Sequence, residues 1–277
     1  MKQLSLGFSP CPNDTFIFDA LIHGKIEHSY DFNIQLADVE ELNNLAFKST
    51  FDITKLSFHA WAYMMDDYQM LPSGAALGFG VGPLLISKRP LDLKELESGT
   101  IAIPGKWTTA NFLMRYNYPT CINKKEYLFS DIEQAVLNDE CVAGVIIHEN
   151  RFTYHQRGLS LIQDLGQAWE NQTNMAIPLG GIAIKRSLSE PIKAEIAQLI
   201  RKSIHFSSEN PASATNYIQE HAQEMAPDVI QKHIDLYVNT YSLDLAEEGR
   251  TAISKMLESL QETKLITDIP PQAILAS

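Results

Sequence analysis

The sequence predicts an α/β protein of two lobes, and three observations support this. Strand-like and helix-like stretches alternate from the first residues onward. Two apolar strands with glycines at their starts, near residues 83–87 and 178–184, separate one α/β unit from another. A chain of 277 residues suits one large domain or two lobes. We therefore predict a first lobe from residues 1–87 and 177–277, an inserted second lobe from residues 88–176, and a ligand cleft between them.

The first lobe shows the βαβ rhythm of a mostly parallel sheet covered by helices. Each predicted strand is short, the one at residues 32–36 alternates apolar and polar residues, and a helix-like stretch follows each strand. The C-terminal part, from residue 188 to about 260, is predicted to be helical throughout, with breaks near Pro211, Pro227 and Ser242. The predicted strands are residues 4–8, 32–36 and 52–56, and the predicted helices are residues 14–23, 38–47 and 58–65.

The second lobe repeats this alternation. Its predicted helices are residues 91–96, 108–116 and 130–138, and its predicted strands are residues 100–103 and 142–147. The second of these strands is a run of six apolar residues, so we expect it to be buried.

The stretch from Ser9 to Phe16 (SPCPNDTF) directly follows the first strand. Its two prolines stop both a central strand and a helix from running through the turn. Asn13 and Asp14 carry side-chain oxygens of the kind that cap a helix start, so we expect the helix to begin beside them. A strand, a rigid turn and a helix N-terminus together form a suitable place for an anionic small molecule. An ordinary capped turn has the same pattern.

Three further strand ends carry polar side chains, and ligands of open α/β sheets bind beyond the carboxyl ends of strands. Lys55 and Ser57 follow one strand, and Thr108 and Thr109 follow another, where hydroxyls and first-turn amides could bind a carboxylate. Simple N-capping explains the threonines equally well. His148 follows the buried apolar strand, and imidazole can accept and return a proton near neutral pH. His148 is therefore the candidate base.

The other histidines are weaker candidates. His59 lies on an apolar stretch and is expected to be packed. The remaining ones that fall in or near helices with polar neighbours are expected to be solvated: His23, His155, His205, His221 and His233.

Composition and missing motifs exclude several functions. The net charge of −12, with no long basic run, argues against a nucleic-acid partner. No stretch is apolar enough for a membrane span or a signal peptide, so we expect no membrane partner and a cytoplasmic protein. Three cysteines without CxxC spacing, and no HExxH, predict no metal site. Neither a P-loop nor a dinucleotide-binding GxGxxG occurs.

Taken in order, these segments resemble the MqnD family, the 1,4-dihydroxy-6-naphthoate synthases of the futalosine route to menaquinone. The resemblance runs from residue 4 to about residue 185. It is carried by SPCPNDTF, by DVEELN from Asp38, by TKLS from Thr54, by IPG from Ile103 with the TTA that starts at Thr108, and by VIIHE from Val145.

The resemblance implies a two-lobed, periplasmic-binding-protein-like (type 2) fold in a lyase. That enzyme would convert cyclic dehypoxanthinylfutalosine to 1,4-dihydroxy-6-naphthoate and dihydroxyacetone without a cofactor. His148 takes the place of the proposed base. Stretches aligned with substrate contacts are Lys55-Leu56-Ser57 and Thr109-Ala110, with Thr108 beside them, and Ser9, Asn13 and Asn43 are further candidates. We expect the crossovers near Gly82 and Gly180 to act as hinges.

Two other readings of the same scaffold stay open at this point. A chorismate dehydratase-like sister enzyme would share the fold and the pathway. A non-catalytic protein that binds a small carboxylate would share the fold alone. The SPCPNDTF start and His148 favour the naphthoate synthase.

Overall fold

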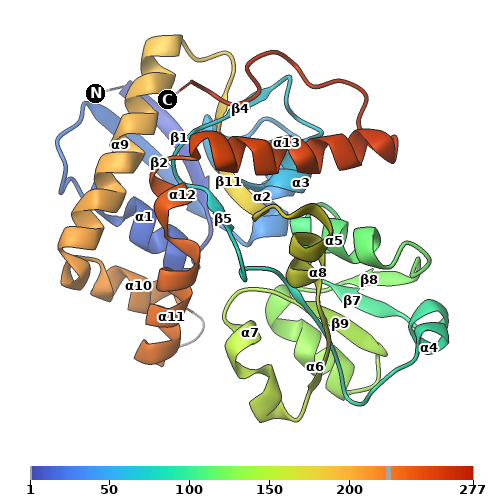
Figure 1. Ribbon diagram of the computed structural model, residues 1–277. Helices are drawn as coiled ribbons and strands as arrows, with labels where there is room; N and C mark the ends of the chain where they lie inside the picture. The colour runs from blue at the N-terminus through green and yellow to red at the C-terminus, as the bar shows by residue number, and fades with distance from the viewer. Residues whose placement is uncertain (1, 223–225, 277) are drawn as a thin grey trace. The chain divides into compact units, whose positions relative to one another are not determined.

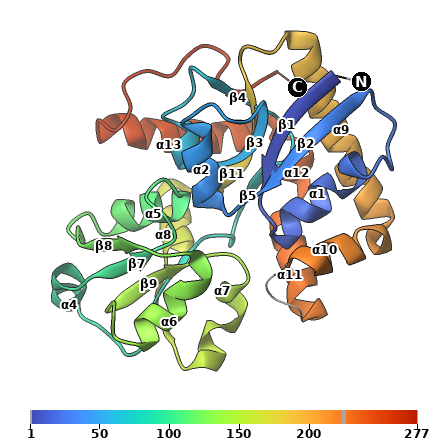
Figure 2. The ribbon, with the colours of Figure 1, turned by 180° about the vertical axis from the view of Figure 1, so that it is seen from behind.

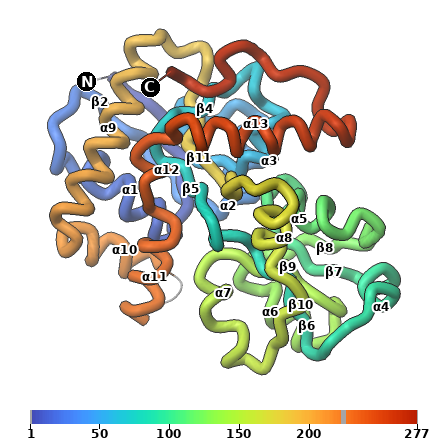
Figure 3. Tube along the Cα trace, viewed as in Figure 1, coloured from blue at the N-terminus to red at the C-terminus, as the bar shows by residue number. Residues whose placement is uncertain are grey.

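The computed structural model describes residues 2–222 and 226–276, and the chain in it divides into two compact units. Unit 1 contains the chain up to Gly78 and again from Pro178 onward, and unit 2 contains Phe79–Ile177. In Figure 3 the blue start and the orange-to-red end of the tube belong to unit 1, and the green middle belongs to unit 2.

Unit 1 is built on a mixed sheet of order β2-β1-β3-β11-β4, with β5 paired to β11. β1 runs parallel to β2 and β3, as the βαβ pattern predicts, whereas β11 runs antiparallel to β3 and β4. The chain enters β11 from unit 2 and not through a single βαβ crossover within unit 1, so nothing requires β11 to run parallel to β3. The expectation of a mostly parallel sheet is therefore wrong here. The strands are β1 (Lys2–Phe8), β2 (Tyr30–Leu36), β3 (Ile53–Ser57), β4 (Tyr68–Met70), β5 (Ala76–Gly78) and β11 (Ile177–Lys185).

Helices cover both faces of this sheet. Figures 1 and 2 show α1 and α9 on one side and α2 and α13 on the other. Leu6 and Phe8 of β1 pack with Ile17 of α1 and Ile200 of α9 in the main hydrophobic core. The helices are α1 (Pro12–Ile22), α2 (Val39–Ala46), α3 (Phe58–Trp61), α9 (Glu190–Glu209), α10 (Thr215–His221), α11 (Pro227–Tyr237), α12 (Thr240–Leu243) and α13 (Ala246–Glu262), with a 3₁₀ turn at Pro211–Ser213.

Two helix predictions in unit 1 are wrong in detail. α1 begins at Pro12, with Cys11 as the N-cap residue and no side-chain cap, so Asn13 and Asp14 lie inside its first turn. Proline suits the first helical position because its fixed φ fits the helix and its missing N–H would have no helical partner there. α3 ends after one turn, although a helix was expected over residues 58–65. Nearly all of residues 58–65 are apolar and buried, so this stretch has no polar face that would favour a longer helix at the surface.

The end of α1 agrees with the sequence. Gly24 has φ of +65°, and Lys25 N–H donates to the Ala20 carbonyl, which forms a Schellman cap.

Unit 2 is built on a second mixed sheet, of order β10-β6-β9-β7-β8. β7 runs parallel to β8 and β9, and β6 runs antiparallel to β9 and β10. The strands are β6 (Leu84–Ser87), β7 (Ile101–Ile103), β8 (Lys124–Glu126), β9 (Ala143–Ile146) and β10 (Ser160–Asp164). The helices are α4 (Leu93–Ser98), α5 (Thr109–Asn117), α6 (Ile132–Leu137), α7 (Asn150–Thr153) and α8 (Leu165–Thr173), with 3₁₀ turns at Phe129–Asp131 and Tyr154–Arg157.

Among the residues that the structure describes, none of the helices has the length and apolar character that crossing a membrane requires.

Candidate functional site

The polar residues predicted in unit 1 lie around the carboxyl ends of β1 and β3. These two strands are parallel neighbours, with Leu6 opposite Ile53 and Gly7 opposite Thr54. Residues 9–11 form the turn between β1 and α1, Asn13 lies in the first turn of α1, and Lys55 and Ser57 are the third and fifth residues of β3. Because Lys55 and Ser57 are two residues apart in a strand, both project from the same face of the sheet.

Asp14 joins three of the predicted residues into one buried network. Its Oδ2 accepts from Ser9 Oγ at 2.7 Å and from Ser9 N–H at 3.3 Å. Its Oδ1 accepts from Asn13 Nδ2 at 2.9 Å and from Lys55 Nζ at 2.8 Å. Each of these four residues is at most 6% exposed. The network makes Asp14, which was not among the predicted site residues, the residue that connects Ser9, Asn13 and Lys55.

Asn43 and Ser57 form a second buried pair in unit 1. Asn43 Oδ1 accepts from the Ser57 backbone N–H at 3.0 Å, and Asn43 Nδ2 lies 3.3 Å from Ser57 Oγ. The same Nδ2 donates to Glu40 Oε2 at 3.1 Å. The Asn43 carboxamide, which is completely buried, therefore ties α2 to the end of β3.

Leu56 is separated from these groups by strand geometry. It stands between Lys55 and Ser57 in β3, so its side chain projects from the opposite face of the sheet, and it is fully buried.

His233 was expected to be solvated, and this is wrong, because the side chain is completely buried. Its Nε2 lies 2.9 Å from Asn13 Oδ1, although 220 positions separate the two residues. Ile230, His233, Ile234 and Tyr237 follow the i, i+3, i+4, i+7 spacing of one helix face. This spacing was the available sequence signal, and it places His233 among the buried apolar residues of α11.

The two threonines predicted in unit 2 lie at the start of α5, and one of them caps it. Thr108 is the N-cap residue: its Oγ1 accepts from Asn111 N–H at 3.2 Å and donates to the Gly105 carbonyl at 2.9 Å. Thr108, Thr109 and Ala110 are all buried. The capping interpretation is therefore correct for Thr108, and the nine-residue helix α5 is the first helix after β7.

Two lysines flank this helix start. Lys106 places its ammonium 4.5 Å from the centre of the Trp107 ring, at an exposed position. Lys124 of β8 donates from Nζ to Asn111 Oδ1 at 2.9 Å. Burial, together with the nearby Arg115 guanidinium, lowers the pKa of Lys124 to about 8.

His148 lies two residues beyond β9, beside the carboxyl end of β7, because β7 and β9 are parallel neighbours. Its φ is +57°, in the left-handed region that residues other than glycine seldom adopt. The imidazole makes an edge-to-face contact with the Phe129 ring at a centroid distance of 4.8 Å, and the residue is partly exposed. Such backbone strain occurs often at functional positions, where the surrounding structure enforces it.

Arg151 fixes the turn that carries His148. Its Nη1 donates to the Gly82 carbonyl at 2.7 Å, and its Nη2 lies 3.6 Å from Asp164 Oδ2. Gly82 itself lies against Gly166: a Cβ added at Gly82 would be only 2.3 Å from the Gly166 Cα. Gly82 is therefore required by the close approach of two backbone segments within unit 2.

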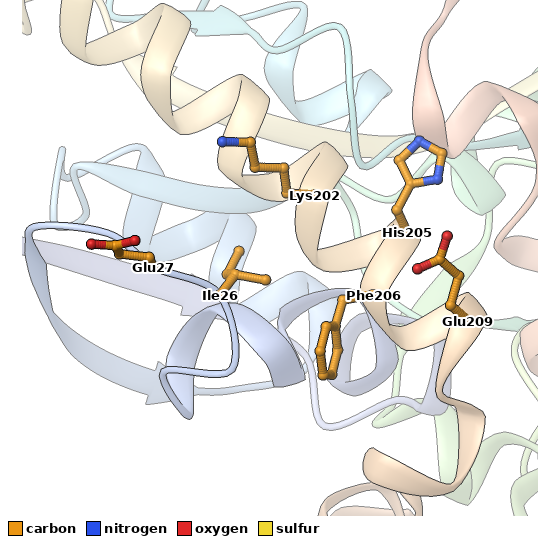
Figure 4. Close-up of a pocket in the computed structure, with 6 residues that line it drawn as sticks. All are labelled: Ile26, Glu27, Lys202, His205, Phe206 and Glu209. Carbon is orange, nitrogen blue, oxygen red and sulfur yellow. The ribbon is translucent and has the colours of Figure 1, made fainter.

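A surface pocket of about 490 Å³ occurs elsewhere in unit 1, and Figure 4 shows the residues that line it. Lys202, His205, Phe206 and Glu209 come from α9, and Ile26 and Glu27 come from the loop after α1. None of the predicted site residues lines this pocket. Within residues 2–222 and 226–276, no three His, Cys, Asp or Glu side chains are placed to hold a metal ion.

Residues 4–262 match the family model described as menaquinone biosynthesis. A curated protein of Thermus thermophilus named "1,4-dihydroxy-6-naphtoate synthase" is 42% identical over 270 residues, 98% of both chains. A Streptomyces coelicolor protein of the same name is 38% identical over 276 residues, which cover 98% of this chain and 97% of the relative.

Solved structures agree on the fold. A crystal structure of an Archaeoglobus fulgidus protein has a TM-score of 0.90 and 33% identity, and covers 95% of this chain and 98% of its own. The alkanesulfonate-binding protein of Xanthomonas axonopodis has a TM-score of 0.72 at 11% identity, with 99% and 96% coverage. The predicted two-lobed, periplasmic-binding-protein-like fold is therefore confirmed, and the chain belongs to the menaquinone-biosynthesis family that includes the 1,4-dihydroxy-6-naphthoate synthases.

Proposed function

We propose that this protein converts cyclic dehypoxanthinylfutalosine to 1,4-dihydroxy-6-naphthoate and dihydroxyacetone, with His148 as the general base. The observation that carries the proposal is the position of His148. It stands at the carboxyl end of a buried strand, in a strained backbone conformation, in a chain 42% identical to a curated naphthoate synthase. Enzymes of this family act in menaquinone biosynthesis, and both curated relatives carry the synthase name.

The chemistry suits an imidazole. The proposed reaction splits one molecule into two without an oxidant or a reductant, so its central requirement is a group that removes a proton. Histidine can do this near neutral pH. Formation of an aromatic naphthalene ring supplies the driving force.

In this proposal the substrate is bound by residues with hydrogen-bond donors. Ser9, Asn13, Lys55, Ser57 and Asn43 of unit 1, and Thr108, Thr109 and Ala110 of unit 2, would hold the carboxylate and hydroxyl groups of the substrate. The α5 N-terminus adds backbone N–H groups and the positive end of a helix dipole. Leu56 would contribute through its main chain, since its side chain lies on the other face of β3.

The test is incubation of the purified protein with cyclic dehypoxanthinylfutalosine and mass spectrometry of the products. Wild-type protein should release dihydroxynaphthoate. His148→Ala should lower kcat roughly 10²- to 10⁴-fold, the usual contribution of a general base, with KM nearly unchanged. His155→Ala is the matched control, because His155 is an exposed histidine seven positions further on, and it should keep full activity. Near-normal turnover by His148→Ala would refute the assignment of the base.

A further inference from the structure

Lys55 has an ammonium group whose hydrogen-bonding capacity the described part of the chain meets only in part. The residue is 5% exposed, and its Nζ donates to Asp14 Oδ1 at 2.8 Å and to the Gly74 carbonyl at 3.1 Å. An ammonium has three N–H donors, and within residues 2–222 and 226–276 Lys55 Nζ makes these two hydrogen bonds and no third. A buried donor of this kind calls for an oxygen from outside the protein chain.

The hydrogen-bonding capacity of Asp14, in contrast, is fully used. Its carboxylate accepts four hydrogen bonds, two from Ser9, one from Asn13 and one from Lys55, which is about the number its two oxygens can take. It therefore has no lone pair left for a substrate group or a substrate proton. What this carboxylate does is fix the directions of the Ser9 hydroxyl, the Asn13 carboxamide and the Lys55 ammonium.

The orientation of Asn13 follows from chemistry. The Asp14 carboxylate paired with Lys55 can only accept, so the Asn13 NH₂ must face it and the Asn13 carbonyl oxygen must face His233. That oxygen in turn can only accept, so His233 Nε2 carries a proton. A single chain of hydrogen bonds thus runs from α11 through α1 to β3, in the order His233, Asn13, Asp14, Lys55.

The packing of α11 supports this chain. Ile230 and Ile234 of α11 pack against Phe16 of α1 in one hydrophobic cluster, which holds the His233 backbone in place beside Asn13.

We propose that Asp14 and His233 are positioning residues for substrate binding, and that they fix the orientation of the Lys55 ammonium. The third N–H of Lys55 would bind an anionic or carbonyl oxygen of the substrate. His233 holds Asn13, Asn13 and Ser9 hold Asp14, and Asp14 holds the ammonium. This inference rests on the proposed function, because it assigns Lys55 to the substrate of that reaction.

The first experiment examines the chain of hydrogen bonds without any substrate. Nitrogen-15 NMR of histidine-labelled protein distinguishes the two neutral tautomers of an imidazole, and His233→Gln identifies the His233 signals by their loss. We expect His233 to carry its proton on Nε2. A neutral His233 protonated on Nδ1 would overturn the inference, whatever the activity of the enzyme.

The second experiment measures KM and kcat separately. Asp14→Asn places an NH₂ group against donors that the carboxylate now accepts from, so KM for cyclic dehypoxanthinylfutalosine should rise roughly tenfold or more, with a smaller change in kcat. His233→Leu removes the donor to Asn13 and should raise KM in the same direction. His233→Gln retains an N–H donor and should stay closer to wild type.

The matched control is Asp19→Asn. Asp19 is a buried carboxylate on the same helix, paired with Lys25 at 2.6 Å and with His23 at 3.0 Å. Asp19→Asn should leave KM unchanged. If Asp14 had a purely structural role, Asp14→Asn would also lose stability without a change in KM, and this result would refute the positioning role. Wild-type protein that forms no product would instead overturn the proposed function, and with it the assignment of Lys55 to this substrate, while the NMR result would still decide the His233–Asn13 contact.

Discussion

The buried ion pair between Lys55 and Asp14 makes a sharp prediction about stability. The two charged atoms are 2.8 Å apart, and the side chains are 7% and 2% exposed. Lys55→Met leaves the Asp14 carboxylate buried without its cation, and Asp14→Asn leaves the ammonium without its anion. The double variant contains neither charge. The effects of the two substitutions on the free energy of unfolding should therefore be far from additive, because the second substitution removes the unpaired buried charge that the first one leaves.

The magnitudes follow from the partners that remain. Removing one member of a buried ion pair costs about 3–5 kcal/mol of unfolding free energy. In Lys55→Met, Asp14 still accepts from Ser9 twice and from Asn13 once, so the loss should be near the lower limit, about 3 kcal/mol. Asp14→Asn should cost about the same. If the two effects were independent, the double variant would lose about 6 kcal/mol; we expect it to be no less stable than Lys55→Met alone.

The assay is urea unfolding of the four proteins followed by far-UV circular dichroism. A second cycle on Lys232 and Asp228 serves as the control, since this pair on α11 lies 3.4 Å apart with side chains 61% and 71% exposed. Its coupling should be below about 0.5 kcal/mol. Additive losses at Lys55 and Asp14, equal to the sum of the single variants, would show that the ion pair carries no coupling and would refute the reasoning.

Two further predictions concern unit 2. Gly166→Ala should destabilise the protein by roughly 3 kcal/mol in urea unfolding, because the new Cβ would lie 2.6 Å from the Gly82 Cα, whereas Gly158→Ala, in open space at φ of +78°, should lose only about 1 kcal/mol; equal losses would show that the contact is unimportant. The lowered pKa of Lys124 means that the unfolded chain holds its proton more tightly than the folded one between pH 8 and 10.5, so this residue makes stability rise with pH through that window. Lys124→Met should abolish that contribution, so the unfolding free energy should rise less between pH 7 and 10 in the variant than in the wild type. An unchanged pH dependence would contradict the burial of the Lys124 ammonium.

The strand ends were the most predictable part of the site. β7 and β9 are short apolar runs, and β1 and β3 contain apolar residues and are followed by a turn or a helix, so the polar side chains at the strand ends could be identified from sequence order alone. The mixed direction of both sheets was not predictable in this way. Strand direction is decided by how β6 and β11 pair with distant strands, and those pairings leave no local signal in the chain.

The buried network shows a different limit. Asp14 was expected to cap a helix by its sequence position, yet its carboxylate instead accepts from Lys55, 41 positions away. His233 was expected to be solvated because Gln231 and Lys232 precede it, yet it lies on the apolar face of α11. In both cases the local pattern correctly predicted a helix. The choice of partner depended on which other helix or strand packs against it.

The glycines near the crossovers illustrate why one residue type can support two explanations. Glycine is used both where the chain must bend and where two backbones must come close. At Gly180 a Cβ would lie 2.7 Å from the Leu56 carbonyl oxygen, and at Gly82 it would lie 2.3 Å from the Gly166 Cα. Contacts of this kind exclude any side chain, whether or not the segment moves. Packing within each unit is therefore a sufficient reason for glycine at both positions.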